Sequence, residues 1–244
     1  MTTNPPPLPT AGGSPPLLDF ARAFQFFFED PEWVKKLAIG SILCLLSPLI
    51  IGAILLGGYI LRVVRRTADG AERVLPDFDD WGGLFRDGLK LFVVYFGHLI
   101  AIFSVPVLIV LVAFLMTGGL GGRNEGLAAL IGVSFAFAYM LFILLAFAFS
   151  LYMPAVLARL AKIDDIGAAF DVRENVAFIL RNPWNYGLTI VLYFITSFVS
   201  QLGMLLCCVG ILPASFWAAT VAAWAIGSTI RLDVKAPRRL PVLI

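Results

Sequence analysis

Four long apolar runs determine what this chain can fold into. They are Leu37 to Leu61, Leu89 to Met116, Leu127 to Leu157 and Gly187 to Ile230. A helix needs about 20 mostly apolar residues to cross the ~30 Å hydrocarbon core of a bilayer, and each run is long enough. Sixty per cent of the residues are hydrophobic and 14% are charged, with a mean hydropathy of +0.92. We therefore predict an all-α, multi-pass membrane protein with one helical membrane domain at residues 17–231, whose first partner is the lipid bilayer.

The two ends of the chain differ from this membrane domain. Residues 1–16, MTTNPPPLPTAGGSPP, hold neither a basic residue nor an apolar core, so we expect no secretory signal there. Their Pro, Gly and Ser content predicts a disordered tail. Residues 232–244 are predicted to form a short basic tail. The net charge of +2 is small and the basic residues are scattered, which argues against binding of nucleic acid.

A short acidic phrase occurs twice, as DDWGGLF at residues 79–85 and as DDIGAAF at residues 164–170. An aspartate at a helix N-terminus caps free backbone N–H groups and complements the helix dipole. On a helix, the first copy and the residues after it place one apolar stripe on one face: Trp81, Leu84, Phe85, Leu89 and Phe92. Both copies, and a looser relative at residues 17–29, are therefore predicted to be amphipathic helices on the membrane surface.

These three stretches divide the domain into units 17–66, 79–159 and 164–231, an internal repeat. Each unit is predicted to be a surface helix followed by a transmembrane helical hairpin, and the three hairpins to form one bundle. The expected turns lie at Ser47-Pro48, at Thr117 to Gly126 and near Cys207 to Pro213.

The first hairpin is predicted to be short or re-entrant, because the halves Leu37 to Leu46 and Leu49 to Leu61 give helices of only about 15 and 20 Å. A single span, a short hairpin and a re-entrant segment all stay open for residues 37–61. If every unit is a hairpin with both ends in the cytoplasm, Arg123 alone of the eighteen Lys and Arg residues lies outside. Because basic residues favour the cytoplasmic side, both termini are predicted to be cytoplasmic.

The polar residues within the apolar runs are the candidates for function. His98 is the ionisable residue deepest in a run, and Ser197, Ser200 and Gln201 form the most polar cluster. His98 is interpreted either as a neutral side chain bonded to a Ser or Thr, or as a proton or metal site. It has no Asp, Glu, Cys or second His at ligand spacing. We expect no metal, no cofactor and no catalytic residues, and hence no enzyme.

Small residues recur every four positions in the last run and predict a helix-packing face: Ser215, Ala219, Ala223 and Gly227. Such spacing lets two helix backbones approach closely. The partner helix could belong to this chain or to another.

Three phrases between Phe26 and Val94 carry a resemblance to a known family. They are EDPEW at residues 29–33, GYILR at residues 58–62 and LPDFDDWGGLFRDGLK at residues 75–90. With these phrases the chain resembles a prokaryotic membrane family known as domain of unknown function 4013. The resemblance implies a multi-pass protein of the prokaryotic cytoplasmic membrane, and it implies no catalytic residues.

The function expected from these features is that of a non-enzymatic accessory, scaffold or membrane-organising component. Its partners would be other membrane proteins or further copies of this chain. The alternative is a transporter or channel subunit with a polar path near Gln201, because many transporter folds are built from internal repeats.

Overall fold

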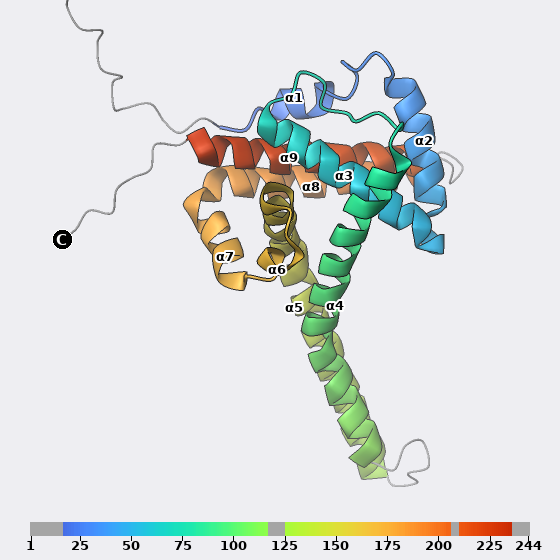
Figure 1. The fold of residues 1–244 in the computed structure, drawn as a ribbon. Helices are drawn as coiled ribbons and strands as arrows, with labels where there is room; N and C mark the ends of the chain where they lie inside the picture. Colours follow the sequence, from blue (N-terminus) through green and yellow to red (C-terminus); the bar gives the residue numbers. More distant parts are fainter. Residues whose placement is uncertain (1–16, 117–124, 206–209, 236–244) are drawn as a thin grey trace, which may run out of the picture.

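The computed structural model describes residues 17–116, 125–205 and 210–235 (Figure 1). Throughout these ranges the structure is helical and without strands, which confirms the predicted all-α class. The helices are α1 (Phe20–Gln25), α2 (Trp33–Leu45), α3 (Ile51–Asp69), α4 (Trp81–Met116), α5 (Glu125–Ile163), α6 (Ile166–Ala169), α7 (Val172–Arg181), α8 (Pro183–Leu202) and α9 (Ile211–Lys235). Single 3-10 turns follow α2 and α8, at Ser47–Leu49 and Gly203–Leu205.

Four helices in the described ranges are long and apolar enough to cross a membrane. They are α4, α5 from residue 131 onward, α8 with its following turn, and α9. The predicted tail at 1–16, residues 236–244 of the predicted C-terminal tail, and residues 117–124 and 207–209 of the two predicted turns lie outside the described residues. Residues 232–235, which were assigned to the C-terminal tail, continue α9 to Lys235.

The first apolar run folds into α2 and α3, which meet at the predicted turn of Ser47 and Pro48. The turn is tight: Ile50 adopts a left-handed φ of 62°, and a Cβ at Gly52 would lie 2.3 Å from the Leu46 carbonyl carbon. Residues 37–61 therefore form a short helical hairpin instead of one continuous helix.

Helices α3 and α4 cross with their backbones in direct contact. A Cβ on Gly58 would lie 1.9 Å from the carbonyl oxygen of Leu84, and a Cβ on Gly88 would lie 1.7 Å from that of Ile54. No side chain fits in either place. Glycine at these two positions allows the helices to approach as small-residue motifs do in membrane proteins.

Helix α9 is the centre of the helical body, since it packs against α2, α3 and α8. Its closest approaches also use glycine. A Cβ on Gly227 would lie 2.6 Å from the Val64 carbonyl oxygen on α3, and one on Gly40 of α2 would lie 2.3 Å from the Phe216 ring. Phe216 is fully buried, between Phe27 before α2 and Tyr59 on α3. We refer to this group of helices around α9 as the body.

The α4–α5 hairpin leaves the body as a long arm, while α3, α8 and α9 lie across the end from which it departs (Figure 1). Phe103 of α4 contacts Phe142 and Phe149 of α5 at ring-centroid distances of 4.8 and 5.9 Å, which joins the two helices of the arm. In the most apolar stretch of each helix only 6% of the residues are buried. Other parts of the same chain thus cover almost none of the arm.

The structure does not confirm the predicted repeat of three units. The α4–α5 and α8–α9 hairpins point in different directions and do not form one parallel bundle (Figure 1). The first acidic phrase has no separate surface helix, because α4 continues without a break from Trp81 to Met116. In the third unit the helix does restart at Pro183, whose missing N–H is harmless at a first helical position.

Candidate functional site

His98 lies in a buried position between α4, α5 and the segment after α6. Its side chain is 5% exposed and stacks on Phe170 at 4.4 Å between ring centroids. Nδ1 lies 2.9 Å from the Val94 carbonyl oxygen, which can only accept, so this nitrogen donates. Nε2 has no hydrogen-bond partner among the described residues. The partner of His98 is therefore a backbone carbonyl one turn earlier, and the Ser or Thr partner of the sequence interpretation is absent from its surroundings.

The polar residues predicted on α8 do not converge. Ser200 is buried and its hydroxyl lies 2.7 Å from that of Ser215 on α9, whereas Ser197 is half-buried and Gln201 is exposed. The predicted packing face of α9 meets two different helices of this chain: Ser215 contacts α8, and Gly227 contacts α3. Ala219 is half-buried and Ala223 is 1% exposed.

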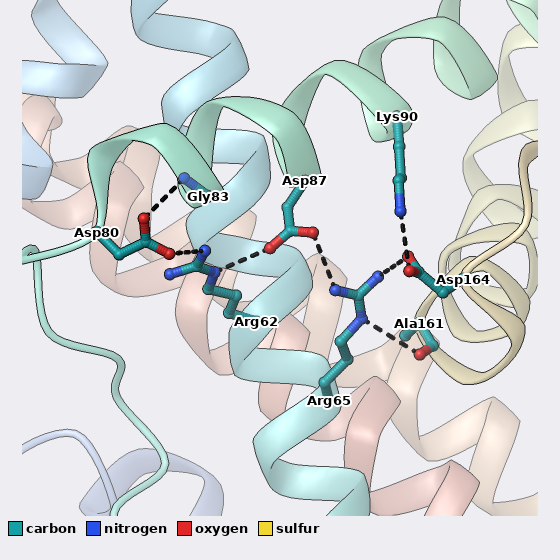
Figure 2. A network of polar contacts seen from close by, with 8 residues as sticks. All are labelled: Arg62, Arg65, Asp80, Gly83, Asp87, Lys90, Ala161 and Asp164. Carbon is teal, nitrogen blue, oxygen red and sulfur yellow. Dashed lines mark hydrogen bonds and ion pairs between the residues drawn. The ribbon is translucent and has the colours of Figure 1, made fainter.

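Six charged side chains form a chain of alternating sign where α3, α4 and α5 meet (Figure 2). The guanidinium of Arg62 donates to Asp80 at 2.8 Å and to Asp87 at 2.9 Å. Arg65, one turn later on α3, donates to the other oxygen of Asp87 at 3.1 Å and also to Asp164. We call this set the charge network: Arg62, Arg65, Asp80, Asp87, Lys90 and Asp164.

The charge network is neutral, with three cations and three carboxylates. Lys90 closes it by donating to Asp164 at 2.8 Å, and Arg65 Nε donates to the Ala161 carbonyl oxygen at the end of α5. Lys90 and then Arg65 hold the pKa of the Asp164 carboxyl below its ordinary value. The Gly83 N–H, followed by Arg62, has the same effect on the pKa of Asp80. Each lowered pKa shows that the pairing favours the charged form.

A second group of charges surrounds Lys36, whose side chain is 4% exposed. Its ammonium group donates to Asp30 at 2.7 Å and to the Leu75 carbonyl oxygen at 3.1 Å, and it pairs with Asp77 at 2.8 Å. Three acceptors thus face its three N–H donors. This pairing with Lys36 lowers the pKa of the Asp77 carboxyl. We call these residues the Lys36 cluster.

Aromatic rings connect the Lys36 cluster with the α3–α4 crossing. Tyr59 is fully buried and stacks on Phe78 with a centroid distance of 4.6 Å and an interplanar angle of 12°, and Phe78 in turn stacks on Trp81. Tyr59 therefore acts as a packing group, with Phe78 on one side and Phe216 on another.

These contacts explain why the acidic phrase occurs twice. The second aspartate of each copy caps a helix: Asp80 accepts from the Gly83 N–H, and Asp165 accepts from the Gly167 and Ala168 N–H groups. Asp80 also belongs to the charge network together with Asp164, the first aspartate of the second copy. The two copies are thus joined through the arginines of α3.

Sequence reasoning missed most of the charge network. Helical periodicity places Asp87 and Lys90 on the side of α4 opposite the apolar stripe, which predicts contact with water, yet the Asp87 side chain is only 15% exposed and lies between two arginines. The face of α4 that packs on α3 contains Leu84 and Gly88, while Trp81 of the predicted apolar stripe is 43% exposed. The sequence holds one signal of the charge network: Arg62 and Arg65 stand one turn apart at the end of an apolar run.

Chemically, the charge network is neutral and the Lys36 cluster pairs one cation with two carboxylates, and in both groups the charged atoms contact one another. Across the described residues, no three His, Cys, Asp or Glu side chains are grouped so that they could hold a metal ion. The arrangement is suited to joining α3, α4 and α5 at the root of the arm.

Comparison with known proteins places the chain in a family. The sequence profile described as "Protein of unknown function (DUF4013)" matches residues 41–209, which is more than half of the chain. The chain belongs to this family. The resemblance found in the three phrases is thereby confirmed. No curated protein and no solved structure gives a match.

The whole charge network falls inside the region that matches the DUF4013 family, and the α3–α4 crossing does as well. Two of the phrases that carried the resemblance contact each other at this crossing. GYILR lies in α3, and LPDFDDWGGLFRDGLK leads into α4. Asp30 and Lys36 precede the matched region. The phrases thus correspond to a packed, charge-paired junction between helices.

Replacing Lys36 by Met should destabilise the protein strongly, because the Asp30 carboxylate, 6% exposed, would lose its buried partner. The expected loss is about 3–5 kcal/mol. Lys35→Met is the matched control: Lys35 is 68% exposed and pairs with an exposed Glu32, so its loss should change the stability little. The thermal unfolding midpoint of each variant in detergent measures the difference. Equal midpoints for the two variants would show that the Lys36 cluster has no role in stability.

Proposed function

We propose that this protein is a non-enzymatic, multi-pass component of the prokaryotic cytoplasmic membrane that acts as an accessory or scaffold for another membrane protein. The observation that carries the proposal is the exposed arm formed by α4 and α5. Membership of a family of unknown function leaves the role open, so the proposal rests on the geometry.

The arm offers a large apolar surface without cover from its own chain. Large side chains on its outside include Tyr139, 68% exposed, and Phe147, 57% exposed. Apolar surface of this extent is found where lipid or another protein covers it. Aromatic side chains offer a large contact area to a partner helix. The charge network meanwhile fixes the arm to the body, so a partner bound to the arm is held in a defined position.

The ion pairs formed by the acidic residues support a non-enzymatic role. Two carboxylates of the charge network, Asp87 and Asp164, each contact two cations. These contacts leave their oxygens occupied.

Transport along a path near Gln201 finds less support. Gln201 is exposed on α8, and the Ser200 hydroxyl is paired with Ser215 inside the α8–α9 hairpin. Neither of the two large cavities at the ends of the helices is lined by these residues. The accessory role is therefore our preferred function.

The accessory role predicts a second, stoichiometric polypeptide in native membranes. The tagged protein would be extracted in lipid-preserving particles and its mass and composition measured. A double variant of the arm, Tyr139→Ala with Phe147→Ala, should lose the second polypeptide, because a partner helix depends on the shape of this surface. Phe198→Ala on α8, a residue 67% exposed, is the matched control and should retain it. A lone protomer or a homo-oligomer in the particles would contradict the role.

We also propose that both termini and the body's charged ends face the cytoplasm, and that the tip of the arm faces the opposite side. Two arginines of α3 and a lysine of α4 meet in the charge network at the body's end of the arm, as the positive-inside rule favours for the cytoplasmic side.

Cysteine labelling tests the topology in a variant whose native cysteines are replaced by serine. A membrane-impermeant thiol reagent added to intact cells should label Gly121→Cys, in the 117–124 segment between α4 and α5. It should not label Glu72→Cys, which is exposed after α3. After lysis both cysteines should react. Labelling of Glu72→Cys in intact cells would reverse the topology.

A further inference from the structure

A cavity of about 620 Å³ opens where the C-terminal ends of α3, α5 and α9 meet. Its size lies within the ~300–1,000 Å³ typical of small-molecule sites. The charged residues that line it are Arg65 and Asp69 of α3, Lys162 of α5 and Arg231 of α9. Three cations therefore face a single carboxylate.

Two of these cations have no partner among the described residues. Arg65 is engaged by Asp87 and Asp164 in the charge network. Lys162 and Arg231 are exposed, and within the described part of the chain neither forms an ion pair or a side-chain hydrogen bond. The ion pairs of the neighbouring helix ends use other residues, such as Arg159 with Asp171. The cavity therefore keeps an unneutralised positive charge.

The position of Arg231 is built into the fold. Gly70 caps α3 in the left-handed conformation, with a φ of 74°. A Cβ at this position would lie 2.9 Å from the guanidinium carbon of Arg231, so the guanidinium packs directly over the glycine. Arg231 also lines a neighbouring cavity of about 520 Å³, where the carboxylates Glu29, Asp30 and Glu72 stand beside Arg22 and Arg73 and balance the positive charge. The excess of positive charge therefore belongs to the cavity between α3, α5 and α9.

We propose that the cavity between α3, α5 and α9 binds a phosphate-bearing anion, with Lys162 and Arg231 as its ligands. The planar fork of Arg and the compact charge of Lys both suit phosphate oxygens. The site stands at the ends of two candidate membrane helices, α5 and α9, which is the depth at which lipid headgroups lie. The phosphate could belong to a phospholipid headgroup or to a soluble phosphate compound, and the experiment below separates these two sources.

The same cations also complement the negative ends of helix dipoles, since Lys162 lies in the last turn of α5. That contribution stabilises the protein equally with and without an anion. An effect of Lys162 and Arg231 that appears only when an anion is added therefore distinguishes an anion site from compensation of the helix dipoles.

The test uses the purified full-length protein in detergent, with native mass spectrometry for lipid binding and thermal unfolding for phosphate binding. The probes are phosphatidylglycerol, zwitterionic phosphatidylcholine and inorganic phosphate. The site variant is Lys162→Gln with Arg231→Gln. The control variant is Arg173→Gln with Arg181→Gln, which removes the same charge from exposed positions on α7.

The wild type should bind phosphatidylglycerol more tightly than phosphatidylcholine. The site variant should weaken phosphatidylglycerol binding about 30-fold, as expected when two cations near the membrane surface are lost. The control variant should bind like the wild type. This pattern, without an effect of inorganic phosphate, assigns the site to a lipid headgroup. Stabilisation by inorganic phosphate that the site variant abolishes assigns it to a soluble phosphate compound.

Two results would overturn the proposal. One is a wild type that binds phosphatidylglycerol no better than phosphatidylcholine and is not stabilised by phosphate, an outcome that requires no variant to fold. The other is a site variant that elutes as a folded protein and binds the probes as the control does. None of these results bears on the accessory role, because the test of that role measures a polypeptide partner and not an anion.

Discussion

The contact of two helix backbones at Gly58 and Gly88 is the constraint on which the remaining structure depends. Helices α3 and α4 approach so closely there that a single methyl group would overlap a carbonyl oxygen of the partner helix. This approach brings the arginines of α3 alongside the acidic residues of α4. It also determines where the arm departs from the body, since α4 is one continuous helix from this crossing to Met116.

The charge network follows from that crossing. Burying or half-burying ions is costly unless each finds a partner. Here Arg62 and Arg65, 21% and 24% exposed, share Asp87 and are completed by carboxylates from the two copies of the acidic phrase. The second copy lies after α5, so the same interactions connect both helices of the arm to α3. The phrases that this chain shares with its family thus have a structural role: their residues build the junction that orients the apolar arm.

Much of the secondary structure could be predicted from local signals. The apolar runs indicated helices, the Ser47-Pro48 turn ended α2, and Pro183 began α8 because proline suits a first helical position. The arrangement of the helices could not be predicted in the same way. Whether Asp87 faces solvent or two arginines depends on the crossing at Gly88, and a helical stripe shows a residue's face without showing its neighbour. The candidates His98 and Gln201 were chosen for depth in an apolar run, which carries no information about the helices around them.

The most direct test of the central claim is the thermal unfolding midpoint of Gly88→Ala compared with that of Gly82→Ala. Both substitutions are in α4 and both raise helix propensity by about 1 kcal/mol. A Cβ at Gly82 meets no atom within 4 Å, whereas one at Gly88 would lie 1.7 Å from the Ile54 carbonyl oxygen. The account predicts a markedly lower midpoint for Gly88→Ala and an unchanged or higher one for Gly82→Ala. A Gly88→Ala protein as stable as the wild type would contradict it.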